Sequence, residues 1–130
     1  MKTQKEKKQF ALEQIAPYYA DPSTCGYDCD TEKCCYITIN NTMCVAGKNM
    51  IKPSKWPNNI SIISIINDNN EEAVFKPEVV GILTKTQWGN LQQIHDNIAR
   101  YLPDKIKTYC EELGLFTYQE LIEFSKKYES

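Results

Sequence analysis

Cysteine is the residue type with the clearest chemical potential in this sequence, because five of its six copies fall within residues 25–47. Thiolate sulfur is a ligand that zinc prefers, and four thiolates can complete a tetrahedral structural site. Because neighbouring residues of a strand point to opposite faces, we expect only one of the adjacent Cys34 and Cys35 to bind a metal. The candidate zinc ligands are Cys25, Cys29, Cys34 and Cys44. Two alternatives stay open, namely buried thiols that pack as small apolar side chains and a disulfide.

A second candidate chemistry is thiol catalysis, with Cys44 as the nucleophile and His95 as the base. Asp96 follows His95 directly, about 100° further round a helix, so we do not expect its carboxylate to orient the imidazole. We also expect no helix to begin after Cys44 and lower the pKa of its thiol. We therefore assign no catalytic residue and interpret His95 as a core histidine that is hydrogen-bonded to the backbone or to the predicted hairpin. A Cys44/His95 thiol enzyme is the alternative.

The composition argues against several other classes of function. The formal net charge is −2, without the basic excess that a protein needs to neutralise nucleic-acid phosphates. The segment Ala46-Gly47-Lys48 lacks the first glycine and the following hydroxyl of a phosphate-binding loop. The longest apolar run, residues 60–66, is too short to cross a bilayer, and the N-terminus carries no apolar signal segment. We therefore expect a cytoplasmic protein without a nucleic-acid or membrane partner.

The elements that would position the cysteines are a loop and a β-hairpin. Residues 35–39 are rich in β-branched and aromatic side chains, and residues 42–46 can pair back on them. Asn40 and Asn41 tolerate the positive φ that a tight hairpin turn requires. The register is left open, because a two-residue loop and a three-residue loop place different cysteines on one face.

Helices are predicted over most of the remaining chain. An amphipathic helix covers residues 2–16 and ends or kinks at Pro17. Residues 59–66 suit either a helix or a strand, and a helix is favoured. The clearest helix starts at residue 85 after a capping box and carries His95 on its apolar stripe. Pro103 begins the next helix, which stops at Gly114, and a second capping box precedes the last helix.

Together these elements predict an α+β fold. A small antiparallel hairpin, residues 34–47, would pack against four or more helices in a single domain spanning residues 1–130. The cysteine-rich loop and hairpin occupy residues 25–47, and the helical portion occupies residues 58–128. We expect the helix of residues 85–102 to be central, with the stripe of His95 facing the hairpin.

Three short motifs occur in order along the chain: C-x-Y at residues 34–36, C-V-A-G at residues 44–47 and L-Q-Q-I-H-D at residues 91–96. This ordered set resembles the motifs of a group of short, uncharacterised phage and prophage proteins. The turn glycine usual in that group is replaced here by Asn41 and Thr42, and Cys25, Cys29 and Cys35 lie outside the shared pattern. The resemblance implies a small viral gene product that acts in the host cytoplasm, where many such products bind and block a host component. The group has no assigned chemistry to carry over to this chain.

The predicted function is that of a small, non-enzymatic binding protein of phage or prophage type. It would counteract a host defence protein or sequester the small-molecule signal of that defence. The candidate ligand-binding residues are Tyr36, Cys44, His95 and Asp96, which all lie within the three motifs. A zinc-binding interaction module is a further alternative, and a homo-oligomer is left open.

Overall fold

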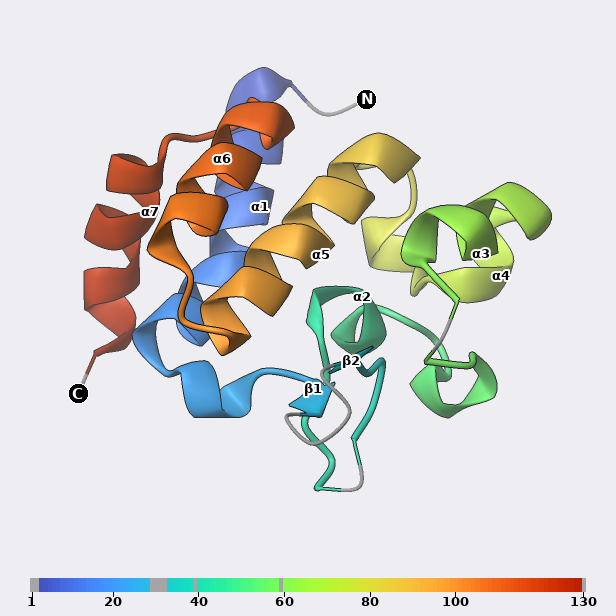
Figure 1. The fold of residues 1–130 in the computed structure, drawn as a ribbon. Helices are drawn as coiled ribbons and strands as arrows, with labels where there is room; N and C mark the ends of the chain where they lie inside the picture. Colours follow the sequence, from blue (N-terminus) through green and yellow to red (C-terminus); the bar gives the residue numbers. More distant parts are fainter. Residues whose placement is uncertain (1–2, 29–32, 39, 59, 130) are drawn as a thin grey trace.

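The computed structural model describes residues 3–28, 33–38, 40–58 and 60–129, and helix α5 (Lys85–Ala99) lies at its centre. The predicted capping box starts this helix: the Thr84 hydroxyl accepts from the Gln87 N–H, and the Gln87 side chain accepts from the Thr84 N–H. Helix α5 packs against α1 (Gln4–Ala20), α2 (Val45–Lys48), α3 (Ile62–Asp68) and α6 (Pro103–Leu113), as Figure 1 shows. Its buried apolar side chains and His95 form the middle of the core.

Helices α6 and α7 (Tyr118–Ser125) cover one side of the molecule, next to α1 (Figure 1). As predicted, Pro103 opens α6, and Gly114 ends it in the left-handed conformation with φ 72°. The second predicted capping box, Thr117 with Glu120, starts α7. Glu120 also pairs with Lys8 of α1, which ties the last helix to the first.

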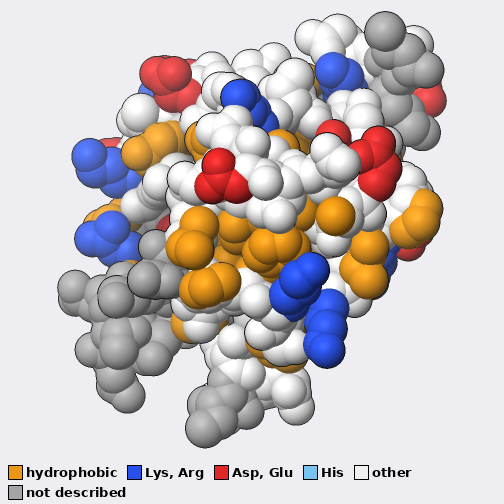
Figure 2. All heavy atoms as spheres, turned by 90° about the vertical axis from the view of Figure 1, so that its right-hand side faces the viewer, with side chains coloured by type: hydrophobic (Ala, Val, Ile, Leu, Met, Phe, Trp, Pro, Cys, Tyr) orange, Lys and Arg blue, Asp and Glu red, His pale blue; other side chains and the backbone are white. Residues whose placement is uncertain are grey.

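Helix α3 and the short α4 (Glu71–Val74) lie on the opposite side of α5 (Figure 1). The prediction of a helix in this region is confirmed, and its N-cap is Ser61. Figure 2 shows apolar side chains gathered on the face that carries these helices. Exposed large apolar side chains of this region are Ile60 and Ile63, at the start of α3, and Ile51, whose N–H donates to the Val74 carbonyl of α4.

Short turns of 3-10 helix link the main helices. Their bounds are η1 Pro22–Thr24, η2 Pro53–Lys55, η3 Pro77–Val79 and η4 Lys126–Tyr128. No helix among the described residues is both long and apolar enough to span a membrane.

The prediction of an α+β fold is wrong, because the described part of the chain is mostly helical and contains very little strand. Among the described residues the only strands are β1 (Tyr27–Asp28) and β2 (Lys33–Cys34), which pair antiparallel over two residues each. An isolated bridge joins Met50 to Phe75. Neither pairing is the hairpin expected over residues 34–47.

The predicted hairpin keeps its turn but not its strands, since residues 35–38 and 42–44 lie outside any strand. Asn41 has φ 65°, and the Thr38 N–H donates to the Thr42 carbonyl at 2.9 Å, so the chain reverses where it was expected to. Residues 45–48, however, form helix α2. The Ala46 N–H donates to the side chain of Gln92 in α5 at 3.1 Å. This tertiary hydrogen bond and the burial of residues 45–47 outweigh a local β preference that is weak by nature.

Helix α1 also differs from its prediction, because it continues past Pro17 to Ala20. Proline removes one backbone donor, but the following turn is held by the packing of Tyr18, which is buried. The Asp21 N–H then donates to the Pro17 carbonyl at 3.0 Å and closes the helix.

Candidate functional site

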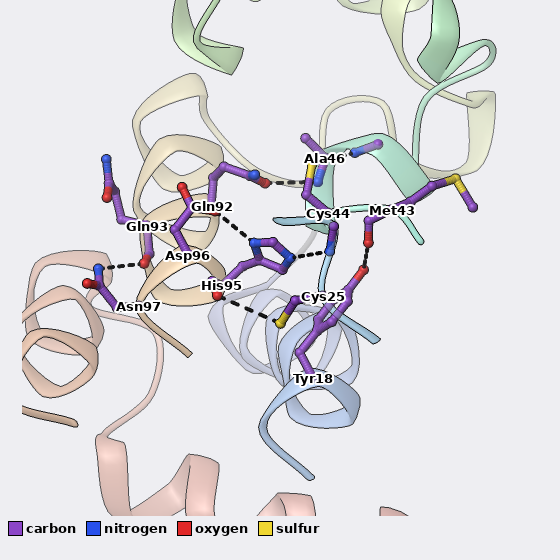
Figure 3. Close-up of polar contacts among 12 residues, drawn as sticks. Tyr18, Cys25, Met43, Cys44, Ala46, Gln92, Gln93, His95, Asp96 and Asn97 are labelled. Carbon is purple, nitrogen blue, oxygen red and sulfur yellow. Dashed lines mark hydrogen bonds and ion pairs between the residues drawn. The ribbon is translucent and has the colours of Figure 1, made fainter. Parts of the chain in front are cut away.

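His95 is completely buried, and both of its ring nitrogens are engaged (Figure 3). The Gly26 N–H donates to His95 Nε2 at 3.0 Å, and His95 Nδ1 lies 2.8 Å from Asp96 Oδ1. Because Nε2 accepts a hydrogen bond, the ring proton belongs on Nδ1, which donates it to the Asp96 carboxylate. The imidazole thus links α5 to the loop that carries Gly26, and the expectation of a hydrogen-bonded core histidine is confirmed.

The expectation that Asp96 would not orient the imidazole is wrong. The two residues are adjacent on α5, yet the short aspartate side chain turns toward the ring of its neighbour. The edge of the imidazole also meets the Tyr18 ring, with centroids 4.8 Å apart and planes at 89°. These contacts hold His95 in one orientation, and Asp96 Oδ2 keeps no hydrogen-bond partner among the described residues.

Cys44 is also completely buried, and it caps the start of α2. Its Sγ accepts from the Gly47 N–H at 3.3 Å, so a helix does begin after Cys44, contrary to expectation. The helix is a single turn of four residues. Such a cap has a structural role, since it satisfies a backbone donor that would otherwise be unpaired.

Two glycines allow the segments around Cys44 to approach each other closely. A Cβ on Gly47 would lie 1.9 Å from the Tyr36 carbonyl oxygen, and a Cβ on Gly26 would lie 2.2 Å from the Cys44 nitrogen. Both contacts are with backbone, which cannot rotate out of the way. The glycine of the C-V-A-G motif is therefore needed for close backbone packing.

The candidate zinc ligands are only partly described. Cys29 lies outside the described residues, and for Cys34 the structure gives the backbone in β2 but not the side chain. Cys25 and Cys44 are both buried, and a chain of backbone hydrogen bonds from Gly26 through Cys35 to Cys44 brings their segments together. Within the described ranges no three His, Cys, Asp or Glu side chains converge to hold a metal ion. The zinc site stays a prediction.

A pocket of about 600 Å³ lies between α3, α5 and α6, close to His95 and Asp96. One wall is apolar and comes from Ile60, Ile62 and Ile63 at the start of α3. Gly89 lets this wall approach α5, because a Cβ there would lie 2.6 Å from the Ile63 side chain. The pocket thus exists where two helices meet at a glycine.

The rest of the lining is polar and aromatic. Helix α5 contributes Asn90, Gln92, Gln93 and Asp96; the remaining polar or aromatic lining residues are Tyr36, Asn58, Ser61 and Tyr109. Tyr36 is buried, and its hydroxyl donates to the Ile60 carbonyl. Asn58 Oδ1 in turn accepts from the Tyr36 N–H at 3.0 Å, so the pocket and the turn before α3 are joined.

Of the four predicted ligand-binding residues, Tyr36 and Asp96 line this pocket. His95 lies behind the lining and holds Asp96, and Cys44 does not line the pocket. A larger hollow of about 870 Å³ lies between α6 and α7 and contains none of the four. The polar residues Asn90 and Gln93 were missed, although Gln93 belongs to the L-Q-Q-I-H-D motif.

One further ionisable group near Cys44 is unusual. The Lys48 amine is largely buried and donates to the Gln14 carbonyl at 2.7 Å, and it lies 4.6 Å from the centre of the Tyr18 ring. Burial lowers the pKa of Lys48 to about 8, and the nearby Cys44 opposes this shift weakly. Lys48 does not line the pocket either, so we assign it to the packing of α2 on α1.

Comparison with known protein families, curated proteins and solved structures found no match to this chain.

Proposed function

We propose that this chain is a non-enzymatic binding protein that holds its ligand in the pocket between α3, α5 and α6. The observation that carries the proposal is the lining of this pocket, which combines an apolar wall with amide groups, aromatic rings and the carboxylate of Asp96. Binding sites for ligands commonly pair an apolar surface with a few fixed polar groups. Asp96 is such a fixed group, because His95 holds one of its oxygens at 2.8 Å.

The geometry favours binding over thiol catalysis. A general base must be free to take a proton, but His95 Nε2 accepts from the Gly26 N–H and its Nδ1 side faces Asp96. Cys44 is completely buried and does not line the pocket. A substrate in the pocket would therefore not meet the thiol.

The setting of this binding protein is the host cytoplasm, and its ligand belongs to a host protein or is a small-molecule signal. The support for this setting is the order of the three motifs, which resembles that of phage and prophage proteins.

Chemical-shift mapping with a mixture of small fragments tests the proposal. Ligands should perturb the amide signals of Asn90, Gln93 and Asp96 in the wild-type protein. The substitution Gln93→Trp should remove this response, because Gln93 is exposed at the pocket and a large ring there fills the space. The matched control Thr86→Trp lies on an exposed part of α5 outside the lining and should respond like the wild type.

A Cys44→Ser variant separates the binder from the thiol enzyme. A serine hydroxyl caps a helix well, so the fold and the response to fragments should be kept. Turnover of any substrate that disappears in Cys44→Ser, while the fold persists, would contradict the proposed function. So would fragments that bind equally well to the wild type and to Gln93→Trp.

A further inference from the structure

The described lining of the α3–α5–α6 pocket carries negative charge and no positive charge. Among the described lining residues Asp96 is the only carboxylate, and none is a lysine or an arginine. The Asp96 side chain is only 21% exposed, so its charge is poorly hydrated and favours a cation in contact with it. A phosphate or carboxylate ligand would meet this charge, and the described lining offers no lysine or arginine to offset it.

His95 does not cancel the charge of Asp96. The Gly26 N–H occupies Nε2, so in this geometry the ring is the neutral form that carries its proton on Nδ1. It donates one hydrogen bond to Oδ1 and leaves Oδ2 without a partner among the described residues. Asp96 is therefore an oriented anion with one oxygen available to a ligand in the pocket.

The neighbouring groups suit a planar cation on a long apolar stem. Ile62 and Ile63 provide an apolar wall, Tyr36 and Tyr109 provide aromatic rings, and the side-chain amide of Asn90 adds a hydrogen-bond acceptor to the lining. A guanidinium matches a carboxylate with two parallel donors and stacks on aromatic rings more readily than an ammonium does. This set of groups is complementary to an arginine side chain.

We propose that this pocket binds the side chain of an arginine on the surface of a partner protein. The inference rests on the proposed function, because it names the ligand of the same pocket. A protein source is favoured over a free guanidino compound by the exposed Ile60 and Ile63 in the pocket lining, which add an apolar contact surface around it. Figure 2 shows apolar side chains gathered on the α3 face.

Titration calorimetry with blocked amino acids tests this chemistry. The probes are Nα-acetyl-arginine amide, the neutral isostere Nα-acetyl-citrulline amide and Nα-acetyl-lysine amide, together with a short peptide that presents arginine between apolar residues. The arginine amide should bind at least about tenfold more tightly than the citrulline amide, because a charge-assisted pair is replaced by a neutral one. The lysine amide should bind more weakly than the arginine amide.

The variant Asp96→Asn should lose about tenfold or more in affinity for the arginine amide while its affinity for the citrulline amide changes little. The control Asp104→Asn, an exposed carboxylate on α6 outside the lining, should bind like the wild type. Well-dispersed amide spectra verify that each variant is folded, and the comparison of arginine with citrulline uses the wild-type protein alone.

The outcomes separate this inference from the proposed function. Tighter binding of the arginine peptide than of the arginine amide supports a protein partner, whereas equal affinities would overturn the protein source. Fragments that perturb the pocket signals, combined with equal binding of the arginine and citrulline amides, would overturn the arginine proposal and leave the proposed function standing. If no probe and no fragment perturbs the pocket signals, both proposals fail.

Discussion

Replacing Gly47 by alanine should destabilise the protein although the change raises intrinsic helix propensity. The new Cβ would lie 1.9 Å from the Tyr36 carbonyl oxygen, whereas real Cβ contacts are almost never shorter than 3.0 Å. The two backbones must therefore move apart by more than 1 Å. Such a shift disturbs the Ala46 hydrogen bond to Gln92 and the link between Cys44 and Cys35.

The expected magnitude follows from two opposing effects. Overpacking against backbone, with strained buried hydrogen bonds, costs about 3 kcal/mol or more. Better helix propensity returns at most about 1 kcal/mol, so the free energy of unfolding should fall by about 2 kcal/mol or more. For a domain of this size the melting temperature should fall by roughly 10 °C.

Urea unfolding followed by circular dichroism measures this change. Gly89→Ala is the matched control, because its Cβ would meet only the flexible end of Ile63 and should change the stability by less than about 1 kcal/mol in either direction. If Gly47→Ala is folded and at least as stable as the wild type, close backbone packing does not shape the segment after Cys44.

Three further predictions concern His95, Lys48 and the cysteines. His95→Leu leaves the Gly26 N–H buried without an acceptor, so urea unfolding should show a loss of about 1–3 kcal/mol; unchanged stability would contradict the assigned hydrogen bond. The pKa of the Lys48 amine is lowered to about 8 in the folded protein, against 10.5 in the unfolded chain. Between these two values the unfolded amine keeps a proton that the folded amine has lost, so the free energy of unfolding should rise with pH. Unfolding measured at about pH 7 and about pH 9 should show the rise in the wild type and not in Lys48→Met. The comparison stops at about pH 9 because burial raises the pKa of Cys110 to about 12. Above the ordinary thiol pKa of 9.0 the unfolded Cys110 loses a proton that the folded one keeps, which lowers the free energy of unfolding. If the cysteines bind zinc, elemental analysis should find about one zinc per chain and chelation should lower the melting temperature, whereas metal-free protein that does not respond to added zinc would exclude the site.

The helices of the second half of the chain were predictable because their signals are local. The capping boxes at Thr84 and Thr117 lie where the two helices start, and Gly114 adopts the positive φ that ends α6. Each of these signals depends on residues within one or two helical turns, so tertiary contacts do not change it.

The segment after the Asn41 turn was not predictable in the same way. Its β preference is local, but helix α2 is selected by the Gln92 side chain of α5 and by the contact of Gly47 with Tyr36. Both contacts join parts of the chain whose proximity no short pattern reveals. The prediction of a hairpin failed for this reason.

The candidate site was predictable only in part. Motif spacing selected Tyr36 and Asp96, which the fold brings to one pocket. The apolar wall of Ile60, Ile62 and Ile63 could not be assigned from the sequence, because its approach to α5 depends on Gly89 in the interior of that helix. An interior glycine in a helix was the available signal, since it usually indicates a close packing contact.

A crystal structure of the protein soaked with the arginine amide and the fragment mixture tests the central claim most directly. We predict a ligand between α3, α5 and α6, in contact with Asp96. A ligand found only in the hollow between α6 and α7, or no ligand at either place, would contradict the assignment of the binding site.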